Sequence, residues 1–160
     1  MRSQSAMEYL MTYGWAILII AIALMALYAM GLFSPKTLVS TSCVFPADFS
    51  CMNSQLLPNG NFSINLEQST SSPINITAIG CNSDTAIYNM LGFSPNITLQ
   101  IGSNITLPQS SSQVLQCFSN GTVFTGSPGD VFHGYVIINY TDIETGFPHT
   151  VTGTVIEKMT

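Results

Sequence analysis

The chain has 160 residues, of which 46% are hydrophobic and only 7% are charged, and its formal net charge at pH 7 is −5. A chain of this length has room for one domain and one additional segment. Its three Lys and Arg residues are too few to form the basic patch that nucleic-acid binding requires, so we expect no nucleic-acid partner.

The N-terminal part contains one long apolar segment. No charged residue occurs between Glu8 and Lys36, and residues Tyr9 to Phe33 would reach about 37 Å as an α-helix. This length is enough to cross a hydrocarbon core of about 30 Å. No polar face recurs at helical spacing, which argues against a helix lying in the membrane plane. The sequence therefore predicts a membrane-spanning helix. Gly31, followed by Pro35, is the signal that ends this helix.

The start of this segment differs from a secretory signal, in which an apolar stretch of about 7 to 15 residues follows a cation. Here an acidic residue, Glu8, directly precedes a longer apolar stretch. A carboxylate at this position is costly unless it is hydrated or paired. Two interpretations are open: Glu8 lies at headgroup depth near the positive end of the helix, or it pairs with a cation when many such helices pack together.

The run RSQSAMEYLMTYGWAILII, which starts at Arg2, resembles the N-terminus of archaeal type IV pilin-like proteins with a class III signal peptide. The family pattern is a basic residue, a small residue and Gln, with Glu four residues after the Gln. Arg2, Ser3, Gln4 and Glu8 match these positions. The resemblance implies that a prepilin-peptidase-like membrane protease cuts between Ser3 and Gln4, so that residues 1–3 are a cytoplasmic leader and the C-terminal part is extracellular.

The resemblance also implies how the mature chain assembles. The amino group released at Gln4 would pair with Glu8 of a neighbouring subunit in a filament core. Two positions depart from the family pattern, because Ser3 replaces the commoner Gly and Ala6 stands where many members have Ser. Both replacements are small residues that a protease groove should accept.

From residue 34 onward the chain is rich in Ser, Thr and Asn, and turn clusters separate short alternating stretches. These stretches predict strands at Asn61–Leu66, Ile74–Ile79, Asn96–Ile101, Gln113–Phe118, Val131–Thr141 and His149–Glu157. The last two predict a C-terminal hairpin. Residues Val131 to Ile138, in the first strand of this hairpin, are apolar on both faces, as in a central strand. We expect an α+β chain in which a hydrophobic helix over residues 4–33 precedes an all-β, sandwich-like domain over residues 34–160.

All four cysteines, Cys43, Cys51, Cys81 and Cys117, lie outside the apolar segment. An even number of cysteines in an exported domain favours two disulfides, for which three pairings are open. We favour Cys43 with Cys51, which closes a short loop, and Cys81 with Cys117. The close Cys spacing of a zinc site is absent, so we expect no metal.

Asn-x-Ser/Thr sequons are about twice as frequent as the composition would produce by chance, and they are candidates for N-glycosylation in an exported domain. They lie at Asn61, Asn75, Asn96, Asn104, Asn120 and Asn139.

No combination of residues suggests catalysis, and we expect neither an enzyme nor a cofactor. His133 and His149 are the only histidines, and neither lies in a motif with a nucleophile. The acidic residues of the β domain are dispersed, and we interpret them as solubilising charges: Asp48, Glu67, Asp84, Asp130, Asp142, Glu144 and Glu157.

The sequence favours a structural, pilin-like subunit that sits in membrane lipid before assembly and then packs with copies of itself, or with related pilins, into a cell-surface filament. The alternative is a single-span membrane anchor whose β domain binds a partner without polymerising.

Overall fold

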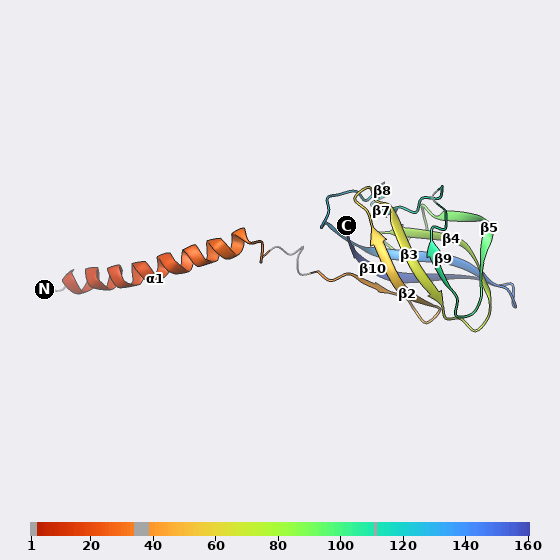
Figure 1. Ribbon diagram of the computed structural model, residues 1–160, viewed down its shortest axis with the longest axis horizontal. Helices are drawn as coiled ribbons and strands as arrows, with labels where there is room; N and C mark the ends of the chain where they lie inside the picture. Colours follow the sequence, from red (N-terminus) through yellow and green to blue (C-terminus); the bar gives the residue numbers. More distant parts are fainter. Residues whose placement is uncertain (1–2, 34–38, 111) are drawn as a thin grey trace. The chain divides into compact units, whose positions relative to one another are not determined.

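A computed structural model describes residues 3–33, 39–110 and 112–160, and it divides the chain into two compact units (Figure 1). Unit 1, Met1–Val39, contains helix α1 (Ser3–Ala29), and unit 2, Ser40–Thr160, is a β domain. The expected order of a long hydrophobic helix followed by an all-β domain is confirmed.

The β domain contains ten strands among its described residues. They are β1 (Ser42–Val44), β2 (Phe49–Leu56), β3 (Phe62–Gln68), β4 (Ile74–Asn82), β5 (Leu91–Leu99), β6 (Asn104–Leu107), β7 (Cys117–Ser119), β8 (Thr122–Val123), β9 (Val131–Asp142) and β10 (Pro148–Lys158).

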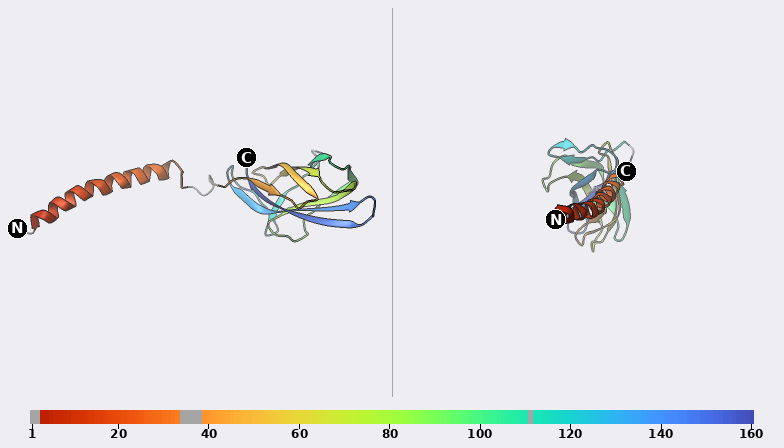
Figure 2. Two further views of the ribbon diagram at one scale, coloured as in Figure 1. Left: turned by 90° about the horizontal axis from the view of Figure 1, so that it is seen from below. Right: turned by 90° about the vertical axis from the view of Figure 1, so that its left-hand side faces the viewer.

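These strands form two sheets. The larger sheet has the order β1-β10-β9-β4-β7-β8, and β5 also pairs with β4. β5 and β7 pair with the same edge of β4. β5 pairs with the first part of this edge, and β7 pairs with Cys81 and Asn82 farther along it. The smaller sheet has the order β2-β3-β6 and lies over one face of the larger sheet (Figures 1 and 2).

The core lies between the two sheets and follows the two-residue period of the strands. In β3, Phe62, Ile64 and Leu66 are buried while the residues between them are partly exposed. Val136 and Ile138 of β9 belong to the same hydrophobic cluster. Because both sheets contribute to one core, the expected sandwich is confirmed.

β9 and β10 form the predicted C-terminal hairpin, with register from Val131↔Lys158 to Thr141↔Pro148. The Asp142 carboxylate caps its turn by accepting hydrogen bonds from the backbone N–H groups of Glu144 and Thr145, at 2.8 and 2.9 Å. β9 pairs with β10 on one side and β4 on the other, so its predicted central position is also confirmed.

Several strand boundaries differ from those expected. Only the end of the predicted strand Gln113–Phe118 is regular, because β7 begins at Cys117. β5 ends at Leu99, and Ile101 lies in the turn that follows. β2 was not predicted, since a register shift between Cys51 and Asn53 interrupts the alternation of buried and exposed residues.

Candidate assembly helix and surface sites

Helix α1 ends in a motif made by its own backbone. Gly31 has a φ of +70° and donates its N–H to the carbonyl of Tyr28 at 3.0 Å, while Leu32 donates to Leu27 at 3.4 Å. This double hydrogen bond is the Schellman C-cap, in which glycine accepts the left-handed conformation without strain. The helix end expected near Gly31 is confirmed, whereas Pro35 lies outside the described residues.

The helix presents apolar side chains in every direction. Every described side chain from Met7 to Met30 is exposed, and Trp15 and Met25 expose 68% and 78% of their surface. Met7–Ala29 is long and apolar enough to cross a membrane, with a mean hydropathy of 2.3. These properties suit a membrane anchor and a signal sequence equally.

Glu8 is the one charged residue in this apolar surface between residues 3 and 33. Its carboxylate is exposed, and its backbone carbonyl accepts a hydrogen bond from the Thr12 hydroxyl at 2.9 Å. The backbone of Ser3 and Gln4 belongs to the first turn of α1, and Gln4 precedes Glu8 by about one turn. Arg2 lies outside the described residues.

Two disulfides cross-link the β domain, and their pairing is the one favoured from the sequence. Cys43–Cys51 connects β1 of the larger sheet to β2 of the smaller one, whereas Cys81–Cys117 joins neighbouring parallel strands within the larger sheet. One bridge therefore holds the two layers together, and the other holds β7 onto β4.

The six candidate glycosylation sites lie in different settings. Asn75, Asn96 and Asn139 are on β4, β5 and β9 of the larger sheet, and Asn104 begins β6 of the smaller sheet. Asn120 is exposed in the β7–β8 turn and has a φ of +51°. Asn61 precedes β3, where its side-chain carbonyl accepts a hydrogen bond from Gln116.

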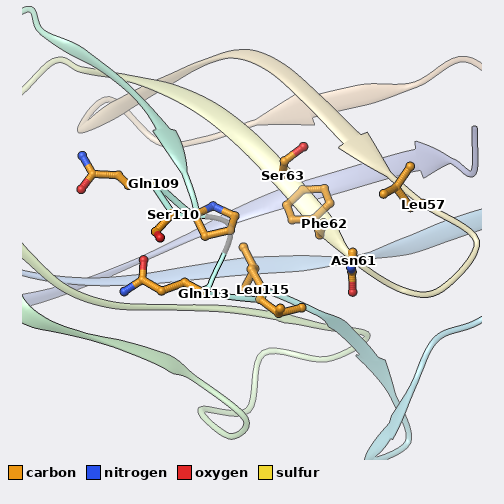
Figure 3. Close-up of a pocket in the computed structure, with 10 residues that line it drawn as sticks. Leu57, Asn61, Phe62, Ser63, Gln109, Ser110, Gln113 and Leu115 are labelled. Carbon is orange, nitrogen blue, oxygen red and sulfur yellow. The ribbon is translucent and has the colours of Figure 1, made fainter.

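A shallow pocket of about 300 Å³ opens beside the start of β3. In Figure 3, Gln109 and Gln113 lie on one side of it and Leu57 on the other, with Phe62 and Leu115 between them. The residues that line it are apolar, amide or hydroxyl side chains without a titratable group. Its chemistry suits a neutral ligand and offers no acid, base or charged nucleophile.

Tyr140 connects His149 to an acidic residue. The His149 and Tyr140 rings stack with 5.3 Å between their centroids, and the Tyr140 hydroxyl donates a hydrogen bond to Asp48 at 3.2 Å. Burial, followed by the charge of Asp48, raises the pKa of Tyr140 to about 12. His133 is exposed. Among the residues that the structure describes, no group of three or more His, Cys, Asp and Glu side chains could hold a metal ion.

The interpretation of the acidic residues as solubilising charges is wrong for Glu157. Its side chain is only 5% exposed and points from β10 toward β2, where the Ser54 hydroxyl donates a hydrogen bond to its Oε2 at 2.6 Å. Burial raises the pKa of this carboxyl, and the hydrogen bond from Ser54 opposes the shift. The inward side of β10 also carries Val151 and Val155, so the alternation of this strand could have revealed the burial of Glu157.

No protein-family profile matches the chain, and a search of curated proteins finds no match. A functional assignment therefore depends on the residues of α1 and on the surface of the β domain.

Proposed function

We propose that the protein is a structural, pilin-like subunit of a type IV-like filament on the cell surface, assembled through α1. The observation that carries this proposal is a helix that is apolar on all sides and bears one carboxylate, Glu8, which is the last residue of the match to the pilin-leader pattern. The proposed leader protease cuts between Ser3 and Gln4. The β domain is then extracellular, where an oxidising environment suits its two disulfides.

The exposed surface of α1 explains why the helix requires neighbours. Covering a Leu, Ile or Met side chain stabilises the covered state by about 1.5–3 kcal/mol, so a helix that is apolar all round must enter lipid or a protein bundle. Lipid covers α1 before assembly. In the filament, α1 helices of other copies, or of related pilins, replace the lipid.

Glu8 distinguishes the filament from a simple anchor. Cleavage after Ser3 removes Arg2 and creates an amino group at Gln4, about one helical turn before Glu8. If neighbouring helices are staggered by about one turn, the amino group of one copy meets the carboxylate of the next. A buried carboxylate is tolerated when it is paired and hydrogen-bonded in this way. Before cleavage, the described part of α1 contains no cation that could pair with Glu8.

The alternative is a single-span surface protein. It is favoured by the pocket between Leu57 and Gln113, which would give the β domain a place to bind a neutral ligand without polymerising. Both proposals are structural or binding roles. We propose no catalytic activity, because neither histidine lies in a sequence motif with a nucleophile and the His149 ring is stacked on Tyr140.

The test combines the N-terminal sequence of the native chain with the variant Glu8→Ala. We expect sheared filaments to contain a chain that begins at Gln4, and Glu8→Ala to abolish the filaments while both disulfides still form. Glu144→Ala is the matched control, because it removes an exposed carboxylate from the β9–β10 turn. Unchanged filaments in Glu8→Ala would contradict the pairing role. A native chain that keeps Met1 and stays monomeric in lipid would support the anchor.

A further inference from the structure

Three sequons that are far apart in the sequence come together on one face of the larger sheet. Asn75, Asn96 and Asn139 each have a Thr two residues later, and residues two apart on a strand point to the same side. The buried partners Ile76 and Tyr140 point into the sandwich, so the Asn and Thr residues beside them point outward.

The strand register aligns these sequons side by side. Asn75 of β4 lies opposite Thr98 of β5 on one edge and opposite Thr141 of β9 on the other. Each of these Thr residues is the hydroxyl member of a neighbouring sequon. Thr98, Asn75 and Thr141 therefore form one row across three strands, with about 4.8 Å between adjacent strands. Each of the three sequons contributes one residue to this row.

Hydrogen bonds across the strands orient the two central amides. Thr98 donates its hydroxyl to Oδ1 of Asn75 at 2.8 Å, and Thr150 donates to Oδ1 of Asn139 at 2.9 Å. In the part of the chain that the structure describes, Nδ2 of neither Asn makes a hydrogen bond. The acceptor atom of each side chain is thus engaged, and its nitrogen is left for a substituent.

Other asparagines of the β domain show the opposite arrangement. Asn65, which is not in a sequon, donates its Nδ2 to the Thr106 hydroxyl at 3.0 Å. Asn82, also outside a sequon, donates its Nδ2 to the backbone carbonyls of Ala86 and Tyr88. A sugar on either of these nitrogens would replace hydrogen bonds that support the fold.

We propose that the outer face of the larger sheet around Asn75, Asn96 and Asn139 is one continuous glycan-bearing surface. This inference depends on the part of the proposed function that puts the β domain outside the cell, and it is independent of polymerisation. N-linked glycans at these positions cover the face and keep it out of contact with other proteins.

Transfer of a glycan to Asn requires two components. The donor is a polyprenyl phosphate- or diphosphate-linked oligosaccharide, and the enzyme is a membrane glycosyltransferase. Nδ2 of Asn attacks the anomeric carbon of the sugar and forms the new C–N bond. The bond from that carbon to the phosphate oxygen breaks, and the lipid phosphate leaves with the bonding electrons. The amide nitrogen loses one proton to a base of the transferase, so the step involves no oxidation or reduction.

The sheet also determines the order of modification. β4 and β9 are paired on both sides, so the backbone around Asn75 and Asn139 cannot bend into an enzyme groove once the sheet has formed. β5 pairs only with β4 among the described strands, which leaves one edge of the strand that carries Asn96 accessible. Asn75 and Asn139 are therefore modified during export and before folding, whereas Asn96 accepts a glycan at either stage.

The first test is mass spectrometry of peptides from the native full-length protein. We expect each of the peptides that contain Asn75, Asn96 and Asn139 to carry the mass of one glycan. Asn75→Gln should remove one glycan mass from the intact chain. Thr98→Ser is the matched control, because it preserves both the Asn96 sequon and a hydroxyl donor for Asn75, and it should leave the mass of the attached sugar unchanged.

Unmodified Asn75 and Asn139 in a chain with both disulfides formed would overturn the proposal, since such a chain has been exported. If the cysteines are instead reduced, the extracellular location in the proposed function fails. In a second test, the unglycosylated folded chain is incubated with membranes that contain the transferase and its lipid-linked donor. Of these three sites we expect modification at Asn96 alone, and modification of the folded chain at Asn75 or Asn139 would overturn the proposed order.

Discussion

The helix and the β domain both form regular backbone hydrogen bonds, but they differ in how much of their apolar surface they bury. Helix α1 forms its hydrogen bonds locally and caps itself at Gly31, but its described side chains from Met7 to Met30 are exposed. The β domain buries a cluster of large apolar residues between two sheets and adds two disulfides. The β domain therefore contains its own solvent-excluded core, whereas the apolar side chains of the helix are left uncovered.

Removing the helix gives the largest expected change. A chain that begins at Ser40 should be soluble without detergent, monomeric and cooperatively folded, because unit 2 contains the whole β-sheet core. The full-length chain should require detergent or lipid. Size-exclusion chromatography and thermal unfolding measure both properties. If the chain from Ser40 onward were unfolded or aggregated, the β domain would depend on α1, and this would contradict the independent folding of the β domain.

Removing each disulfide in turn tests how much it contributes to the free energy of unfolding of the β domain. Cys81→Ala with Cys117→Ala opens a loop with a sequence separation of 36, for which chain entropy predicts a loss of about 4 kcal/mol. Cys43→Ala with Cys51→Ala opens a separation of only 8, and the same relation predicts about 2.5 kcal/mol. Denaturant unfolding measures the two losses. Equal losses would show that layer-to-layer bracing by Cys43–Cys51 contributes beyond loop entropy.

Two carboxyls near opposite ends of β10 should give small pH effects of opposite sign. The pKa of Glu157 is raised by burial, so its contribution to stability is complete below its unfolded pKa and is lost as pH rises through the folded pKa. Glu157→Gln cannot ionise and still offers a carbonyl oxygen to Ser54. We expect this variant to be more stable than the wild type at pH 7.

The pKa of Asp142 is lowered, first by the hydrogen bond from Ser72 and then by the backbone N–H of Thr145. Its contribution is present above the unfolded pKa and is lost as pH falls through the folded pKa. Asp142→Asn should therefore be less stable than the wild type at pH 7 and lose less stability in acid. Thermal unfolding of both variants between pH 3 and about 8 separates the two directions. The same sign for both variants would contradict this account.

Much of the architecture could be predicted because local patterns determine it. The apolar run between Glu8 and Lys36 has one stable secondary structure, and glycine at Gly31 permits its C-cap. The alternation in Val131–Thr141 and His149–Glu157 predicted the C-terminal hairpin, and apolar residues on both faces of the first strand predicted its central position. The favoured disulfide pairing was also correct.

The missed elements lack a local signal. β2 mixes polar and apolar residues and contains a register shift between Cys51 and Asn53, and β1, β6 and β8 are short. The alternation of β10 already puts Glu157 on its inward side, but its hydrogen-bond partner Ser54 lies on β2, which was not predicted.

Local sequence patterns account for the hydrophobic helix, its end, the two hairpin strands and the positions of six sequons, because each of these depends on residues that are close in the sequence. Strand pairing, by contrast, was needed to show that Asn75, Asn96 and Asn139 share one face and that the buried Glu157 meets Ser54 of β2. These properties depend on which strands pair and in what register. Long-range burial between the two sheets determines that register, and a one-residue shift would turn every side chain of a strand to the other face.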